Sequence, residues 1–184
     1  MEGSDRRLHR EGAGAEGGLA AGNTEQGTRN KGTTKQVRIR PAVLADEVAV
    51  LALLEQLFEP PGARAPGYTP ERGREGFRHA AGHPEADVLL AVDGEAIVGL
   101  ASVYADILSI RYGKRCWLQD LVVRKDRRAR GVGKLLLDAA REWARERGCT
   151  HLELGSGIGR KDAHRFYLRE GMVQGYTFTR RIED

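Results

Sequence analysis

A basic segment that contains two glycines has the clearest potential for chemistry in this sequence. Residues 124–134 read RKDRRARGVGK, and Asp126 is the single acid among them. At the start of a helix, a turn that contains glycine leaves backbone N–H groups unpaired, and the helix dipole adds positive potential there. Such a turn can bind a pyrophosphate, and Gly131 and Gly133 would let the backbone approach its oxygens closely. The segment therefore predicts an anion-binding site.

Two common phosphate-binding motifs do not fit this chain. A P-loop requires GxxxxGK followed by Ser or Thr, and Lys134 is followed by Leu135. The nearest match to a dinucleotide-binding GxGxxG is the segment 155–160, in which Arg160 takes the place of the third glycine. This segment also lies too late in the chain to be followed by the strand and acidic residue of such a site.

The basic segment resembles the acyl-CoA signature of the GNAT superfamily of N-acetyltransferases, [QR]-x-x-G-x-[GA]. The matching residues, with the lysine that follows them, are Arg128, Ala129, Arg130, Gly131, Val132, Gly133 and Lys134. The resemblance implies that these residues bind the phosphates of acetyl-CoA, mainly through backbone N–H groups. It also implies that the preceding strand, at Leu121, Val122 and Val123, hydrogen-bonds the pantetheine arm, and that a bulge splays this strand from the next.

A second block nearer the C-terminus agrees with this resemblance. Residues 161–172, KDAHRFYLREGM, resemble the family's helix with the pattern A-x-x-F-Y-x-x-x-G-[FYM]. The resemblance implies that Tyr167 lies beside the CoA sulfur and protonates the departing thiolate, since a phenol is protonated at neutral pH. The block is most similar to aminoalkylphosphonate N-acetyltransferases, which fit an arginine at position 160. Arg160 is therefore expected to contact the cofactor or a substrate anion.

The general base is not defined by the resemblance. Many family members place a carboxylate near the start of the central strand, and in the phosphonate enzymes it helps to hold a metal. That position corresponds to Trp117 here. Asp120 is the remaining acid on the strand, either as a catalytic base or as a structural hydrogen-bond acceptor. His79 and His83 are expected in solvent, and no metal ligands are predicted.

The elements that must position these residues follow from the hydrophobic pattern. Residues 117–123 are nearly all apolar, as in a strand at the centre of a sheet, and residues 132–147 have apolar positions at helical spacing. The expected order is strand 37–40, helices 46–58 and 70–81, strands 87–92, 95–105 and 117–123, helix 132–147, strand 151–154, helix 161–170 and strand 173–182. This order predicts an α/β domain of the GNAT type, with a mixed, mostly antiparallel central sheet flanked by helices.

The composition suits one globular domain over residues 37–184. The chain has 184 residues, of which 40% are hydrophobic and 30% charged. Residues 1–36 hold few large apolar side chains and are expected to be disordered. No apolar run approaches the roughly 20 residues of a membrane helix, and the first residues lack a secretory signal. A cytoplasmic protein without a membrane partner is expected. Cys116 and Cys149 have no metal-ligand spacing.

The expected activity is transfer of the acetyl group of acetyl-CoA to a primary amine of a small molecule. Direct attack by the amine is expected, with the N–H of Val122 or Val123 polarising the thioester carbonyl. An inactive CoA-binding sensor and a basic nucleic-acid-binding module are the alternatives. No nucleic-acid partner is expected, because the basic segment lacks interleaved aromatic residues and any known nucleic-acid motif. The acceptor and the oligomeric state stay open, with an aminoalkylphosphonate-like amine and a homodimer among the candidates.

Overall fold

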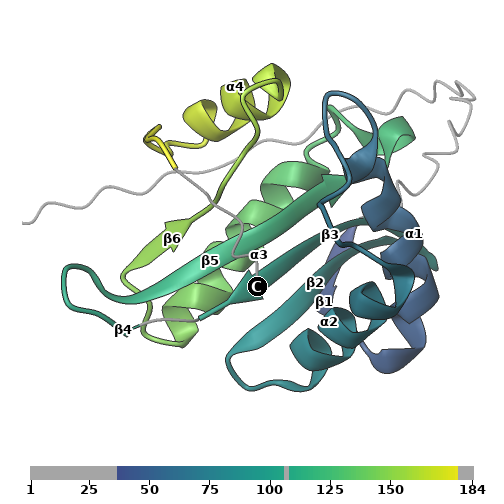
Figure 1. Cartoon of the computed structure of the whole chain (residues 1–184), viewed down its shortest axis with the longest axis horizontal. Coiled ribbons are helices and arrows are strands. Elements are labelled where there is room, and N and C mark those ends of the chain that lie inside the picture. The colour runs from purple at the N-terminus through teal and green to yellow at the C-terminus, as the bar shows by residue number, and fades with distance from the viewer. Residues whose placement is uncertain (1–36, 106–107, 178–184) are drawn as a thin grey trace, which may run out of the picture. The chain divides into compact units, whose positions relative to one another are not determined.

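The computed structural model describes residues 37–105 and 108–177 (Figure 1). The elements are β1 (Arg38–Pro41), α1 (Glu47–Phe58), α2 (Pro70–Gly82), β2 (Ala86–Asp93), β3 (Ala96–Tyr104), β4 (Leu108–Ser109), β5 (Gly113–Val123), α3 (Val132–Glu146), β6 (His151–Glu153) and α4 (Lys161–Arg169). Short 3-10 turns precede α1 and α3, at Leu44–Asp46 and Lys125–Arg127. The expected N-terminal tail, residues 1–36, lies outside the described residues.

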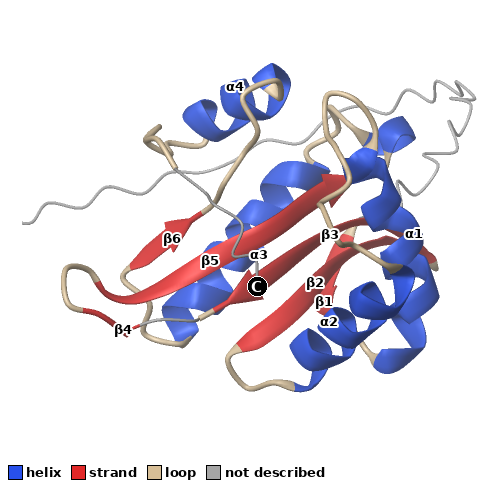
Figure 2. Ribbon diagram, in the orientation of Figure 1, coloured by secondary structure: helices blue, strands red, loops and turns tan. Residues whose placement is uncertain are grey.

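The six strands found in the described residues form one mixed sheet in which antiparallel pairs predominate. β1, β2, β3 and β5 are antiparallel neighbours in that order. β5 also pairs with β4, again antiparallel, and with β6, which is parallel to it. Figure 2 shows β5 running the length of the sheet between β3 and β6. The predicted fold class is therefore confirmed, as is the central place of the apolar strand.

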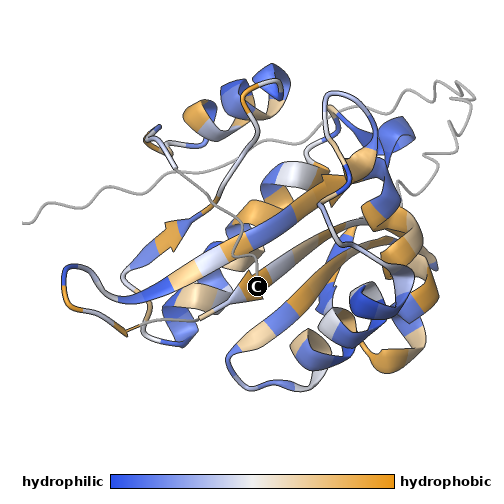
Figure 3. Ribbon diagram, in the orientation of Figure 1, coloured by the Kyte–Doolittle hydropathy of each residue, from blue (hydrophilic) through white to orange (hydrophobic). Residues whose placement is uncertain are grey.

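Helices cover both faces of this sheet and bury two apolar cores. On one face, α3 packs through Leu136 and Leu137 onto Leu118 of β5 and its neighbours. On the other face, α1 and α2 cover a second core. α2 buries only Phe77 and Ala80, and Figure 3 shows the rest of it as largely hydrophilic. Among the described residues, no helix is long and apolar enough to cross a membrane.

The structure differs from the expected elements in three places. β5 begins at Gly113 instead of residue 117, because its first residues pair with β4 and β6. The two-residue strand β4 was not expected, since so short a segment carries no periodic pattern. The strand expected at 173–182 does not form over residues 173–177, where Val173 and Tyr176 are exposed, and the remainder lies outside the described residues.

Asp46 lies directly before α1 and connects this helix to β1. It occupies the position before the helix but makes no capping hydrogen bond to it. Its carboxylate instead accepts bonds of 2.7 and 2.8 Å from Arg40 and one of 2.8 Å from the N–H of Val43. The Arg40 hydrogen bond is the main cause that lowers the pKa of Asp46. The carboxylate thus links β1 to the start of α1.

Gly99 of β3 allows α3 to lie close to the sheet. A Cβ at this position would lie 2.9 Å from Leu136 Cδ1, 3.0 Å from Val122 O and 3.3 Å from Val132 Cγ1. We expect Gly99→Ala to lower the free energy of unfolding by about 1–3 kcal/mol in denaturant titrations, because strand or helix must shift. Gly76→Ala is the control: no atom lies within 4 Å of its Cβ, and the substitution should stabilise α2 by roughly 0.5–1 kcal/mol. Equal stabilities would contradict the close packing.

Candidate active site

Among the residues that the structure describes, the last residues of β5 have a strand partner on one side only. β6 pairs with β5 over residues 115–117, whereas β3 stays paired with β5 as far as Val123. After β6 the chain turns away from β5 towards α4 (Figure 1). Within the described part of the chain, residues 118–123 therefore present a free strand edge on the side where the family resemblance implies that the next strand is splayed away.

The pairing of β3 with β5 decides which backbone groups lie on this free edge. The Arg124 N–H donates to the Val98 carbonyl at 2.9 Å. In an antiparallel pair the bonded residues alternate, so Val122 is also bonded to β3. Leu121 and Val123 direct their N–H and carbonyl groups to the opposite side. Of the three predicted pantetheine-binding residues, these two offer backbone groups at the free edge.

The loop after β5 has the backbone of an anion-binding site. Ala129 and Gly131 both adopt left-handed conformations, with φ of 57° and 82°. Left-handed residues within such a turn gather successive N–H groups into a concave site for anions. The first bond of α3 joins the Leu135 N–H to the Gly131 carbonyl at 3.1 Å. Within the described ranges, none of the six N–H groups from Ala129 to Lys134 meets an acceptor.

The basic side chains of this loop differ in how much of their charge is already compensated. Four of them pair with carboxylates: Arg124 with Asp126, Lys125 with Glu59, Arg127 with Asp93, and Lys134 with Asp138 and Glu170. Arg128 donates from Nε to the Val123 carbonyl at 3.0 Å. In the part of the chain that the structure describes, Arg128 and Arg130 pair with no carboxylate. These two arginines, more than Lys134, therefore supply charge for an anion.

Helix α4 packs against the start of α3 through Phe166. A Cβ at Gly133 would lie 3.6 Å from the Phe166 ring and 3.8 Å from the Val123 side chain. Gly133 therefore faces α4 and β5, whereas Gly131 faces open space. The Tyr167 ring lies 5.3 Å from that of Phe166, centroid to centroid. Burial raises the pKa of Tyr167, partly opposed by the charge of Arg160, so its phenol stays protonated at neutral pH.

Arg160 joins the start of α4 to the end of α1. Its Nη2 donates to the Leu57 carbonyl at 2.5 Å. The Lys125 N–H, in the loop after β5, donates to Gln56 Oε1 at 3.1 Å. The C-terminal end of α1 therefore contacts both loops that border the free edge of β5. Arg160 was expected to contact a cofactor or a substrate anion, and here its guanidinium donates to the protein backbone.

Asp120 lies on the face of β5 that α1 and α2 cover, opposite Ser102 of β3. The Ser102 hydroxyl donates to Asp120 Oδ2 at 2.7 Å and accepts from the Asp120 N–H at 3.1 Å. Burial raises the pKa of Asp120, and the Ser102 hydrogen bond partly opposes this rise. The charge of Asp120 contributes to a raised pKa of Tyr104, behind burial as the main cause. Neither Ser102 nor Tyr104 was singled out from the sequence.

Trp117 occupies the strand position at which many members of the resembling family place a carboxylate. Its Nε1 donates to Gln119 Oε1 at 2.7 Å, and its ring would lie 3.7 Å from a Cβ at Gly155. The rings of His79 and His83 lie 4.8 Å apart at the exposed end of α2. Across residues 37–105 and 108–177, no group of three or more His, Cys, Asp or Glu side chains is arranged to hold a metal.

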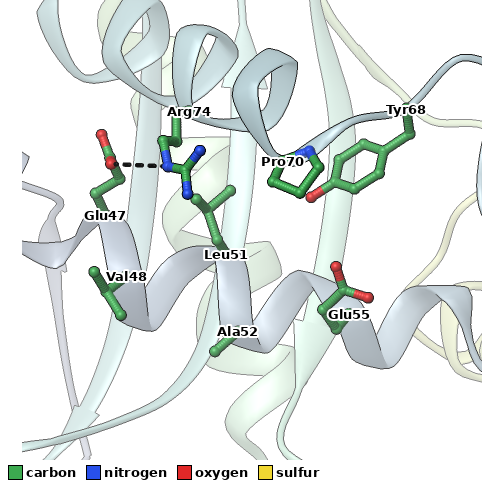
Figure 4. Close-up of a pocket in the computed structure, with 8 residues that line it drawn as sticks. All are labelled: Glu47, Val48, Leu51, Ala52, Glu55, Tyr68, Pro70 and Arg74. Atoms are coloured by element: carbon green, nitrogen blue, oxygen red, sulfur yellow. Dashed lines mark ion pairs between the residues drawn. The ribbon is translucent and has the colours of Figure 1, made fainter.

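A separate pocket of about 230 Å³ lies between α1 and α2. It is lined by Glu47, Val48, Leu51, Ala52, Glu55, Tyr68, Pro70 and Arg74. Figure 4 shows Tyr68 and Pro70 facing α1, with the ion pair between Glu47 and Arg74 at the other end, at 3.8 Å. The pocket contains none of the residues predicted to bind a cofactor or to act in catalysis.

The sequence matches known acetyltransferases over most of its described length. The sequence profile of the Acetyltransferase (GNAT) family matches residues 50–172. An uncharacterized N-acetyltransferase of Bacillus subtilis, YhdJ, is 50% identical over 77 residues, which are 41% of this chain and 54% of that protein. The aminoalkylphosphonate N-acetyltransferase of Salmonella typhimurium is 35% identical over 113 residues, 59% of this chain and 71% of that protein. The chain thus spans about half the length of the first relative.

Solved structures show the same fold. A transcriptional regulator from Bacillus halodurans is 26% identical with a TM-score of 0.68, covering 80% of this chain and 100% of that one. An aminoglycoside N-acetyltransferase in complex with CoA is 18% identical with a TM-score of 0.66, covering 79% of this chain and 95% of that one. The second likeness, at this low identity, supports the fold alone.

Proposed function

Because the chain belongs to the Acetyltransferase (GNAT) family, we propose that it transfers the acetyl group of acetyl-CoA to a primary amine of a small-molecule acceptor. The observation that carries this proposal is the row of unpaired N–H groups at residues 129–134, directly after a strand with a free edge. The N–H groups of the loop can bind a pyrophosphate, and the strand edge beside it can bind an arm that contains amides.

In this proposal the cofactor is held mainly by the backbone. The N–H groups of residues 129–134 bind the pyrophosphate, and Arg128 and Arg130 add charge-assisted hydrogen bonds. The backbone of Leu121 and the carbonyl of Val123 pair with the amides of the pantetheine arm, in the way that an added strand pairs with a sheet edge, which leaves the Val123 N–H for the thioester carbonyl. Three predicted residues change in these assignments. Val122, already bonded to β3, and Lys134, already paired with two acids, have smaller roles, and Arg160, which donates to the Leu57 carbonyl, is given none.

Three groups of the chain serve the chemical step. Asp120 accepts a proton from the acceptor ammonium, directly or through water, and the free amine attacks the thioester carbonyl carbon. The Val123 N–H donates to the carbonyl oxygen as negative charge develops on it. As the C–N bond forms and the C–S bond breaks, Tyr167 gives its proton to the leaving thiolate, and the phenolate then takes the remaining extra proton from the acetylated nitrogen, which ends as a neutral amide. Positioning contributes strongly, because the thioester is already an activated acyl donor.

The test is thiol release from acetyl-CoA in the presence of a panel of primary amines, 2-aminoethylphosphonate included. We expect release that depends on the amine. The phosphonate belongs in the panel because one relative carries that activity in its name. We expect the same rates with a chelator and with added Mg²⁺, since Trp117 replaces a carboxylate. Calorimetric binding of CoA without release from any amine would favour a CoA-binding sensor instead.

A further inference from the structure

Ser102 is a polar residue in an otherwise apolar interior. Its exposed fraction is 5%, and among the described residues it is the one buried side chain that is polar or charged. A buried hydroxyl costs free energy unless it is hydrogen-bonded. Within the described residues, both hydrogen bonds of the Ser102 hydroxyl join it to Asp120 of the neighbouring strand. The hydrogen bonds to Asp120 therefore offset the cost of burying the Ser102 hydroxyl.

The two hydrogen bonds fix the direction of the Ser102 hydroxyl proton. Ser102 Oγ accepts from the Asp120 N–H at 3.1 Å, which occupies one lone pair of the oxygen. The hydroxyl proton is then directed to Asp120 Oδ2, at 2.7 Å. The β3–β5 register shifts just beyond this pair, between Ser102 and Val103, and this irregularity lies beside the paired side chain and amide. Oδ2 is thus restrained by a donor whose own orientation is fixed.

No other described group stabilises the charge of this carboxylate. Tyr104 of β3 is the titratable neighbour that senses it, and the phenol bears no positive charge. α1 also packs on β3 and β5, but its acids are engaged elsewhere, Glu47 with Arg78 and Glu55 with Arg64. In the described ranges no cation pairs with Asp120. The Ser102 hydroxyl is the group that opposes the effect of burial.

We infer that Ser102 is a positioning residue for acetyl transfer, whose hydroxyl orients the Asp120 carboxylate and stabilises its charged form. This inference rests on the proposed function, in which Asp120 removes a proton from the acceptor amine. The base acts only when it is ionised, so activity rises as pH passes upward through the pKa of Asp120. Removal of the hydroxyl leaves burial unopposed, and the carboxyl then keeps its proton to a higher pH.

The direct test is the carboxyl pKa of Asp120 in Ser102→Ala. We expect it to rise by roughly one unit or more, the size of the effect of a hydrogen bond to a charged group. The measurement is a pH titration of ¹³C-labelled aspartate carboxyls by NMR in the full chain, with Asp120→Asn to assign the signal. Ser102→Thr keeps the hydroxyl and should keep a pKa near that of the unmodified protein. An unchanged pKa in Ser102→Ala overturns the inference.

The second test is the pH profile of kcat/KM with an amine from the panel. In Ser102→Ala the acidic limb should move up by the same amount as the carboxyl pKa, and activity at high pH should recover. Ser109→Ala is the control, because it removes a hydroxyl that accepts from the Arg111 and Tyr112 N–H groups. It should change neither the Asp120 carboxyl pKa nor the acidic limb. If the Asp120 carboxyl pKa shifts in Ser102→Ala while the acidic limb of kcat/KM stays in place, Asp120 is not the base. The positioning role of Ser102 would then be wrong as well. If the protein acetylates the amine but Ser102→Ala changes neither the Asp120 carboxyl pKa nor the acidic limb, the proposed role of Ser102 is wrong and the proposed activity stands.

Discussion

Replacing Gly131 with aspartate is expected to weaken the binding of acetyl-CoA by about one to three orders of magnitude. Gly131 precedes α3 with a φ of 82°, and no atom lies within 4 Å of a Cβ there. The new carboxylate would project into the open space at the unpaired N–H groups. At about 4 Å from a phosphate, it costs about 1 kcal/mol at a dielectric constant of about 80 and about 4 kcal/mol at about 20. Each 1.4 kcal/mol or so is a tenfold change in Kd.

Gly148→Asp is the matched control for this substitution. Gly148 follows the other end of α3 with a φ of 71°, and no atom lies within 4 Å of its Cβ either. It therefore receives the same charge and a similar backbone strain, about 25 Å away at 1.5 Å per helical residue. Gly131→Asn separates the two causes, because asparagine tolerates a left-handed conformation and carries no charge. We expect Gly131→Asn to bind more tightly than Gly131→Asp.

Isothermal titration calorimetry with acetyl-CoA measures these affinities, and thermal unfolding shows whether each variant is folded. A Gly131→Asp protein that is folded and binds with an unchanged Kd would contradict the assignment of residues 129–134 to the phosphates. A loss of affinity in Gly148→Asp as large as that in Gly131→Asp would show that the loss comes from the helix and not from the loop.

Local patterns predicted the glycine-containing turn with unpaired N–H groups and the helix that follows it. The apolar period of 132–147 predicted α3 within one residue of its observed end at Glu146. The unpaired N–H groups follow from the same local geometry, since a helix without a side-chain cap leaves its first donors free. Such local patterns are sufficient to predict a segment when its structure depends mainly on residues close to it in the sequence.

The parts of the site that escaped prediction depend on contacts between distant segments. Ser102 and Asp120 are 18 residues apart, and they meet only because the bulge between β3 and β5 sets that register. Arg160 reaches the Leu57 carbonyl across 103 residues. Lys134 was expected to attract an anion, but Glu170 of the α4 end compensates its charge. The hydrophobic periodicity of a single sequence does not predict the register of paired strands, and it does not predict which distant group a long side chain contacts.

Asp120 and Tyr167 have opposite proton-transfer roles in the proposed mechanism. Asp120 belongs to β5, and Tyr167 belongs to α4, whose Phe166 lies beside Gly133 as the Val123 side chain does. Burial raises both pKa values. For the carboxyl this brings the pKa nearer to neutral pH, which suits a base, and for the phenol it keeps the proton in place, which suits an acid. The same physical cause thus supports both proposed roles.

Tyr167→Phe is therefore expected to lower kcat by about 100-fold while KM for acetyl-CoA changes by less than about threefold. General acid catalysis contributes roughly 10² to 10⁴ in rate, and a thiolate is a good enough leaving group to place this step at the lower end. Phenylalanine keeps the packing of the ring beside Phe166, 5.3 Å away. An interaction made only in the transition state lowers kcat and leaves KM nearly unchanged. Steady-state kinetics with the preferred amine measures both constants.

The defect of Tyr167→Phe is expected to be independent of pH. Because burial raises the pKa of Tyr167 above its usual value of 10.0, the phenol remains the acid form across an assay range of about pH 6 to 9. The defect of Tyr167→Phe should then be the same throughout that range, whereas the defect of Ser102→Ala should fade as pH rises. Tyr176→Phe removes the hydroxyl of a side chain that is 92% exposed, and it should leave both constants unchanged. Full activity in Tyr167→Phe would reduce Tyr167 to a packing residue and require another proton donor for the thiolate.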